Sequence, residues 1–133
     1  MRAILTILAF LAAAPLAAQP AGCSGSASQM EMNMCAGVNF QAADARLNAV
    51  YREVTARLDG AKSARRKLVA AQRAWIAFRD AECSYVTSGT EGGSINSMLY
   101  TQCMTGMTDK RTDELRAQLT CEEGDLMCPV PPK

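Results

Sequence analysis

Two long segments of the chain carry apolar residues at helical spacing. Over about residues 40–58, the apolar side chains lie three or four positions apart, at Leu47, Val50, Tyr51, Val54 and Leu58. Over about residues 63–86, a second stripe consists of Leu68, Ala71, Trp75, Phe78 and Tyr85. Such spacing puts each set on one face of an α-helix. The pattern therefore predicts two amphipathic helices.

A short turn separates these two helices. The Asp-Gly dipeptide at 59–60 is a typical stop signal, and so short a connection makes the helices an antiparallel hairpin. Simple antiparallel register about this turn places Leu47 opposite Trp75 and Asp44 within one helical turn of Arg79. We therefore expect an ion pair between Asp44 and Arg79 at the open end of the hairpin.

A short helix is expected before the hairpin. Ser28 and Glu31 have the spacing of a capping box, which begins a helix over about 29–35. Gly37 suits a left-handed residue at the end of this helix, and Asn39 is a suitable cap for the helix that follows. These signals predict a break in the helical backbone between the two.

A loop and a third long helix are expected after the hairpin. Residues 87–94 contain three glycines and small polar side chains, which predict a loop. A further helical stripe follows at Ile95, Leu99, Cys103, Met107, Arg111, Leu115 and Leu119. Residues 121–133 hold three prolines and three acids, so we expect an extended or disordered tail. The predicted fold class is all-α: a small disulfide-stapled bundle with an antiparallel hairpin, a third long helix and a short N-terminal helix.

The first residues have the pattern of a signal peptide. Arg2 precedes an almost wholly apolar run over 3–16, and small residues follow. The run is shorter than the roughly 20 residues of a transmembrane helix, and no second apolar run predicts a transmembrane segment. We expect cleavage near Ala18, which leaves a helical domain over 19–120 and the tail. The expected location is the periplasm or the extracellular space.

Cys23 raises lipid anchoring as an alternative. Residues 20–23 resemble the end of a bacterial lipobox, but proline stands at position 20, where leucine is expected. Lipidation of Cys23 would also leave an odd number of cysteines in an oxidising compartment. Anchoring through Cys23 is therefore the less favoured interpretation.

The six cysteines behind a signal peptide indicate disulfides rather than a metal site. The chain has no histidine and no Cys-x-x-Cys pair, so no metal or other cofactor is expected. Pairing of sequence neighbours gives Cys23–Cys35, Cys83–Cys103 and Cys121–Cys128. Hairpin geometry leaves a second connectivity open, with Cys35–Cys83 and Cys23–Cys103.

The charge balance argues against a nucleic-acid partner. Of 14 basic and 13 acidic residues, one base, Arg2, lies in the signal peptide, so the mature chain is balanced. A nucleic-acid-binding domain is usually strongly basic. The cluster Lys62, Arg65, Arg66 and Lys67 is local, and we interpret it as the solvated start of a helix.

The sequence does not predict an enzyme. Without histidine, no Ser-His-Asp or Cys-His arrangement is possible. Asp80 and Glu82 point about 200° apart on a helix and cannot flank one bond. Glu82 and Arg79 lie close to the stripe of Trp75 and Phe78, and a structural ion pair is favoured over a catalytic acid there.

The loop over 87–94 is the candidate recognition element. It is rich in hydroxyls and lies between Cys83 and Cys103. Exposed loops on a rigid scaffold commonly carry binding residues. The candidate binding residues are Ser88, Thr90, Glu91 and Ser94.

Several motifs, in this order, resemble the LprI-type lysozyme-inhibitor family of small bacterial envelope proteins. They are Cys23 with Ser28-x-x-Glu31-Met32-Asn33-x-Cys35, Ala43-Asp44-x-x-Leu47-Asn48-x-x-Tyr51, the segment from Ala71 to Cys83, Gly92-Gly93-Ser94-Ile95, Cys103, and Thr108-x-x-Arg111-Thr112-x-x-Leu115. The resemblance covers Cys23 to about Leu119. Cys121 and Cys128 lie beyond it.

The resemblance implies an exported, non-catalytic binding protein whose partner is lysozyme. The matched positions themselves are interpreted as scaffold: Leu47, Tyr51, Trp75 and Phe78 as core, and Asp44 with Arg79 as an ion pair. An alternative is a structural or stress-related envelope protein that acts through another partner and has no contact with lysozyme. A family motif that explains a fold does not by itself explain a function.

Overall fold

The computed structural model describes residues 28–131 as a bundle of three long helices. These are α1 (Gln29–Arg57), α2 (Lys62–Val86) and α3 (Asn96–Ala117), with short 3-10 helices η1 (Ser88–Thr90) and η2 (Gln118–Thr120). The described part of the chain contains no strand, which confirms the all-α prediction. The predicted signal peptide and Cys23 lie outside the described residues.

Helix α1 is continuous, so the predicted break near Gly37 is wrong. Gly37 and Asn39 both lie inside the helix, and the separate N-terminal helix is its first part. Ala36 and Ala43 are fully buried and extend the stripe of Leu47 back through the expected break. Their burial offsets the roughly 1 kcal/mol cost of a glycine in a helix. The Ser28–Glu31 capping box is confirmed as the start of α1.

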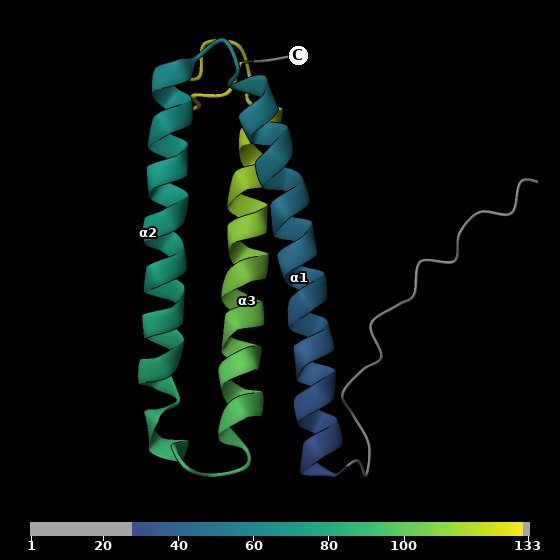
Figure 1. Cartoon of the computed structure of the whole chain (residues 1–133). Coiled ribbons are helices and arrows are strands. Elements are labelled where there is room, and N and C mark those ends of the chain that lie inside the picture. The colour runs from purple at the N-terminus through teal and green to yellow at the C-terminus, as the bar shows by residue number, and fades with distance from the viewer. Residues whose placement is uncertain (1–27, 132–133) are drawn as a thin grey trace, which may run out of the picture.

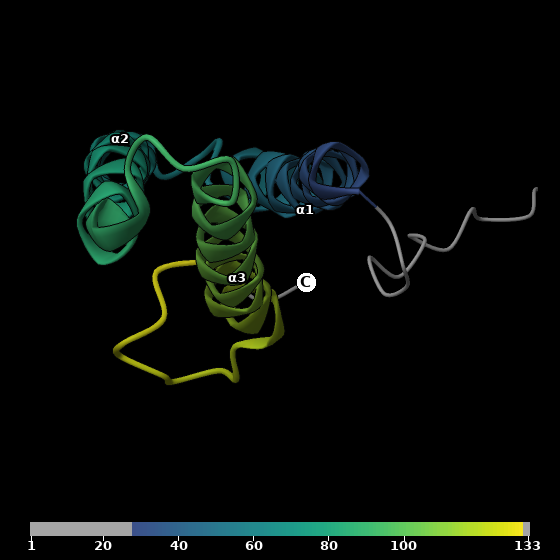
Figure 2. The ribbon, with the colours of Figure 1, turned by 90° about the horizontal axis from the view of Figure 1, so that it is seen from below.

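Helix α3 lies between α1 and α2 along most of the molecule (Figures 1 and 2). It runs parallel to α1, which is its main packing partner, and antiparallel to α2. The hairpin of α1 and α2 is therefore antiparallel as predicted, but its two helices are splayed. A groove of about 310 Å³ between them is lined by residues that include Asp44, Asn48 and Gln72.

The core lies at the end of the bundle where α1 turns into α2. Its buried residues are Leu47, Val54, Leu58, Leu115 and Val130, with Tyr51, Leu68 and Trp75 packed against them. The prediction of an extended or disordered tail is therefore wrong for the described part of the tail. The segment after α3 arches over this end of the bundle (Figure 1) and inserts the side chain of Val130 into the core.

Two disulfides lie within the described residues. Cys83–Cys103 joins the last turn of α2 to α3, and Cys121–Cys128 closes the tail. Both predicted pairings are confirmed, and the rival connectivity through Cys35–Cys83 is wrong. Cys35 is also disulfide-bonded, while Cys23, its predicted partner, lies outside the described residues. None of the described helices is long and apolar enough to cross a membrane.

Candidate binding surface

The loop between α2 and α3 is held in shape by its own hydrogen bonds. The Thr87 hydroxyl donates to the Cys83 carbonyl at 2.7 Å, and the Thr90 hydroxyl donates to the Thr87 carbonyl at 2.8 Å. The Asn96 amide donates to the Thr87 carbonyl and the Thr90 hydroxyl, both at 3.0 Å. Gly92 has φ of +78°, a backbone conformation that favours glycine. The loop is therefore a compact, well-defined turn.

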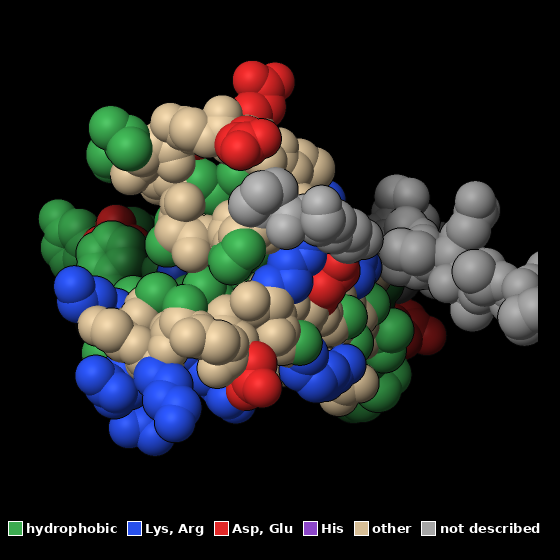
Figure 3. Space-filling view, turned by 90° about the horizontal axis from the view of Figure 1, so that it is seen from above, with side chains coloured by type: hydrophobic (Ala, Val, Ile, Leu, Met, Phe, Trp, Pro, Cys, Tyr) green, Lys and Arg blue, Asp and Glu red, His purple; other side chains and the backbone are tan. Residues whose placement is uncertain are grey.

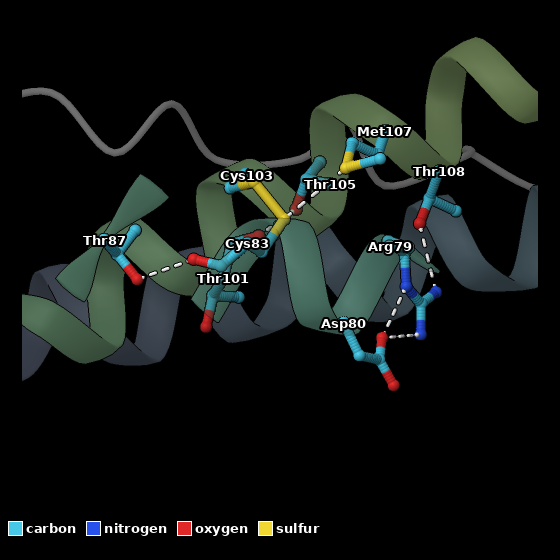
Figure 4. Close-up of a disulfide and its surroundings, with 9 residues drawn as sticks. All are labelled: Arg79, Asp80, Cys83, Thr87, Thr101, Cys103, Thr105, Met107 and Thr108. Atoms are coloured by element: carbon cyan, nitrogen blue, oxygen red, sulfur yellow. Dashed lines mark hydrogen bonds and ion pairs between the residues drawn. A yellow bond between two sulfur atoms is a disulfide. The ribbon is translucent and has the colours of Figure 1, made fainter. Parts of the chain in front are cut away.

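Two attachments fix the base of this loop. The Cys83–Cys103 disulfide joins the helices on either side of it (Figure 4). At its far side, the Asn33 side-chain amide of α1 donates to the Ser94 carbonyl at 3.2 Å. These two attachments keep the loop near one conformation, so binding a partner would cost less conformational entropy.

The loop presents three of its four candidate binding residues to solvent. Ser88, Glu91 and Ser94 are exposed. Thr90 is half-buried, and its hydroxyl is used inside the loop as both donor and acceptor. The structure therefore places Thr90 as a residue that shapes the loop.

Arg79 lies at the centre of the contacts that attach α2 to the other helices. Its guanidinium is buried, pairs with Asp80 at 2.8 Å and donates to the Thr108 hydroxyl of α3 at 3.3 Å (Figure 4). It also lies over the rings of Phe40 of α1 and Trp75, at 5.4 and 5.2 Å from their centroids. The predicted Asp44–Arg79 ion pair is wrong.

The absence of that pair has a simple reason. The two residues line the same groove between α1 and α2, but α3 keeps these helices apart and the adjacent Asp80 reaches the guanidinium first. Asp44 instead accepts a hydrogen bond from Asn48 at 2.8 Å.

Trp75 is a structural residue, whereas Phe78 is exposed. The Trp75 ring is flanked by Arg79 and by Arg111 of α3, whose guanidinium lies 6.0 Å from the ring centroid and donates to Gln72 at 3.1 Å. Phe78 is 57% exposed, so its predicted place in the core is wrong. The buried residues of α2 are Gln72, Arg79 and Cys83, so polar contacts replace apolar ones along this face.

A second groove lies between α2 and α3, next to the loop. It measures about 480 Å³, and Trp75, Phe78, Glu82, Val86, Cys103, Met107, Lys110, Arg111 and Glu114 line it. Arg111 and Glu114 pair with each other at 3.0 Å. The sequence did not predict this groove, because Phe78 was expected to lie in the core. The spacing itself gave the signal, since Phe78, Glu82, Tyr85 and Val86 share one helical face.

Charge is unevenly distributed between the two ends of the bundle. We call residues 28–43 and 78–107 the loop end. It carries four carboxylates, Glu31, Asp80, Glu82 and Glu91, against one cation, Arg79, which gives a formal net charge of −3. The other described residues, 44–77 and 108–131, carry eleven cations against nine carboxylates. A balanced chain thus has an acidic end.

The opposite end combines a basic edge with an acidic tail. Lys and Arg side chains gather along one side of it (Figure 3), where the first half of α2 contributes Lys62, Arg65, Arg66 and Arg73 to a shallow surface. In the tail, Cys121, Asp125 and Cys128 lie close enough together to suggest a metal site. Because the two sulfurs are bonded to each other, they offer no thiolate ligands.

These features define a small, disulfide-linked, all-α domain with a shaped loop at one end. The chain belongs to the family described as lysozyme inhibitor LprI, whose family model matches residues 22–115. It is also similar to the uncharacterized protein R02472 of Rhizobium meliloti (strain 1021), at 37% identity over 115 residues. That match covers 76% of this chain and 81% of the relative. No solved structure matches the chain.

Proposed function

We propose that this protein is an exported, non-catalytic binding protein that inhibits lysozyme by occluding its glycan-binding cleft. The observation that carries the proposal is the loop at 87–94, which is polar, largely exposed and fixed at its base by the Cys83–Cys103 disulfide. The hydroxyls of Ser88 and Ser94, together with backbone amides of the loop, would donate hydrogen bonds to the catalytic carboxylates of the enzyme. Family membership supports lysozyme as the partner.

The charge distribution supports this partner. A chain with balanced charge would associate slowly with lysozymes, which are usually very basic. The loop end, however, has a formal net charge of −3. Complementary charge at the contact surface increases the association rate and favours one orientation of the complex.

Two further parts of the proposal rest on the sequence. Residues 1–18 would direct export and be removed, and Cys23 would then pair with Cys35 rather than carry a lipid. Disulfides persist in the periplasm and outside the cell, which agrees with the bridges between Cys83 and Cys103 and between Cys121 and Cys128.

A non-catalytic role agrees with the positions of Asp80 and Glu82, the two carboxylates discussed above as catalytic candidates. Asp80 is bound by the guanidinium of Arg79, at 2.8 Å. Glu82 lies two positions further along the helix, so its side chain projects in another direction. This geometry provides no carboxylate pair that could flank one bond.

The test is a turbidity assay with purified, oxidised protein and several types of lysozyme. We expect the wild type to inhibit. The variant Ser88→Ala/Glu91→Gln/Ser94→Ala should lose potency by about tenfold or more, which corresponds to about 1.4 kcal/mol. Thr90 is left intact because its hydroxyl shapes the loop.

A matched control carries comparable changes at exposed positions of the opposite end, Ser63→Ala/Glu123→Gln, and should inhibit as the wild type does. Absence of inhibition by the wild type at tens of micromolar would refute the proposal and favour an envelope role through another partner. Full potency of the triple variant would remove the loop from the mechanism.

A further inference from the structure

We propose that the lysozyme-binding surface extends beyond the loop, along an exposed aromatic stripe of α2 that accepts a lysine or arginine side chain of the enzyme. The stripe consists of Phe78, Glu82, Tyr85 and Val86. This inference rests on the proposed function and adds to it the surface that would supply most of the binding energy.

The apolar side chains of the stripe are exposed rather than packed against the described part of the chain. Phe78 is 57% exposed, Tyr85 is 75% exposed and Val86 is 55% exposed. On a helix their positions at i, i+7 and i+8 form one continuous face, with Glu82 at i+4 between them. A contiguous apolar patch of this kind commonly marks an interaction site, unlike apolar residues scattered singly over a surface.

The groove beside the stripe combines an aromatic floor with an uncompensated carboxylate. Phe78, Glu82 and Val86 of the stripe line it together with Trp75 and Met107. Glu82 is half-buried, and no ion pair or hydrogen bond joins its side chain to another residue within 28–131. The Trp75 ring is already flanked by Arg79 and Arg111, so the open aromatic ring of the groove is that of Phe78. The Phe78 ring and the Glu82 carboxylate together form a receptor for a cationic side chain, through cation–π contact and a charge-assisted hydrogen bond.

The other charged side chains that line the groove do not prevent a cationic side chain from binding there. Arg111 is neutralised by Glu114 at 3.0 Å. Lys110 is exposed, and its flexible stem allows its ammonium to remain in solvent. Of the two carboxylates that line the groove, Glu114 is paired with Arg111, and only that of Glu82 has no ion pair or hydrogen bond within residues 28–131.

Charge and continuity both identify the occupant as a basic protein that also contacts the loop. The stripe lies on the loop end, whose formal net charge is −3. Val86 directly precedes Thr87, and the Cys83–Cys103 disulfide holds stripe and loop in one arrangement (Figure 4). Aromatic anchors at the centre with polar contacts at the edge are the usual anatomy of a tight interface.

The test compares variants of the stripe with a matched variant on the other side of α2. Phe78→Ala/Tyr85→Ala should raise the inhibitory concentration and the calorimetric Kd for lysozyme by about tenfold or more. Glu82→Gln should raise Kd about threefold to tenfold and make it less dependent on salt. Because these side chains are largely exposed or unpaired, the thermal transitions should stay near that of the wild type.

Ile76→Ala is the control, because Ile76 is also exposed on α2 but lines the groove toward α1. It should bind as the wild type does. If the wild type inhibits and the Phe78/Tyr85 variant stays within about twofold of it, the stripe is not part of the interface. If the wild type itself neither binds nor inhibits lysozyme, the proposed function is refuted. The proposal for the stripe then fails as well, because lysozyme is its stated partner.

Discussion

A single arginine links all three helices at the residue scale. The Arg79 guanidinium contacts Phe40 of α1, Trp75 and Asp80 of α2, and Thr108 of α3. Its side chain is 8% exposed, whereas that of Asp80 is 45% exposed. A buried guanidinium is tolerated only when its donors are satisfied, and here hydrogen bonds and two aromatic rings do so.

Removal of Arg79 should destabilise the bundle far more than removal of its carboxylate partner. We expect Arg79→Ala to lower the free energy of unfolding by about 2–4 kcal/mol, because Thr108 and the rings of Phe40 and Trp75 lose their contacts with the buried guanidinium. Asp80→Asn should cost less than about 1 kcal/mol, since a half-exposed ion pair is screened by solvent. Urea denaturation followed by circular dichroism measures both values. Equal losses in the two variants would contradict this assignment.

The capping box at the start of α1 provides a pH-dependent contact. The Ser28 backbone N–H and hydroxyl donate to the Glu31 carboxylate at 2.7 and 3.0 Å, and the backbone hydrogen bond is the main reason that the pKa of Glu31 is lowered. Because the folded pKa is depressed, the contact stabilises the helix end above the ordinary glutamate pKa. That contribution is lost as the pH falls through the lowered pKa.

We therefore expect the first turn of α1 to fray on acidification while the rest of the bundle persists. Cα chemical shifts at residues 29–32 should move toward coil values as the pH falls below the ordinary glutamate pKa of about 4.3. In Glu31→Gln the same shifts should be nearly independent of pH. An equal pH dependence in this variant would mean that another group controls the helix end.

The spacing of apolar residue types predicted only some of the core positions. Leu47, Tyr51 and Trp75 lie in or against the core as their spacing indicated. Phe78 followed the same spacing but is exposed, because Gln72, Arg79 and Cys83 occupy the buried face of α2. Periodicity of apolar residues identifies a helix face, but it cannot show that a face of mixed polarity is the one that packs.

At the scale of elements, α1 and α3 form the packed unit, and α2 is attached to it through polar contacts at one end and core residues at the other. Small buried residues, Ala36 and Ala43, lie along α1 in this unit. Sequence predicted the three long helices, and their capping box and loop, from strong local signals. It did not predict the continuity of α1, because the break signals at Gly37 and Asn39 are local while the compensating burial is tertiary.

The tail is the element whose role differs most from expectation. Its sequence is rich in proline and acids, as in a disordered segment, yet Val130 is 2% exposed and lies among Leu47, Val54, Leu58 and Leu115. The Cys121–Cys128 disulfide closes the turn that directs Val130 into this core. A single apolar residue after the last cysteine gave little signal in the sequence.

Opening this turn should destabilise the whole bundle. We expect Cys121→Ser/Cys128→Ser to lower the free energy of unfolding by about 2–4 kcal/mol. Val130→Ala should cost about 1–2 kcal/mol, since it removes two buried methyl groups. Chemical denaturation under non-reducing conditions measures both. Leu126→Ala is the control, because Leu126 is 99% exposed and should be neutral; a cysteine variant as stable as this control would show that the tail is dispensable.

At the scale of the whole molecule, the fold separates charges that are mixed along the sequence. The family could be identified from the order of motifs, and two of the disulfides from their spacing. The acidic loop end could not be predicted, because Glu31 and Glu91 are 60 positions apart in the chain and come to the same end only when Asn33 of α1 contacts Ser94 of the loop. The candidate loop was predicted from local composition, whereas the groove between α2 and α3 required the packing.

The separation of charge has a consequence for how the molecule meets a partner. With a net charge of −3 on one end and +2 on the rest of the described chain, the bundle is an electric dipole along an axis of roughly 40 Å, the length of α1. In the field of a highly basic protein, such a dipole experiences a torque before contact, and it turns its loop end toward the source. Orientation would then precede docking, so that a larger fraction of diffusional encounters begins with the correct end.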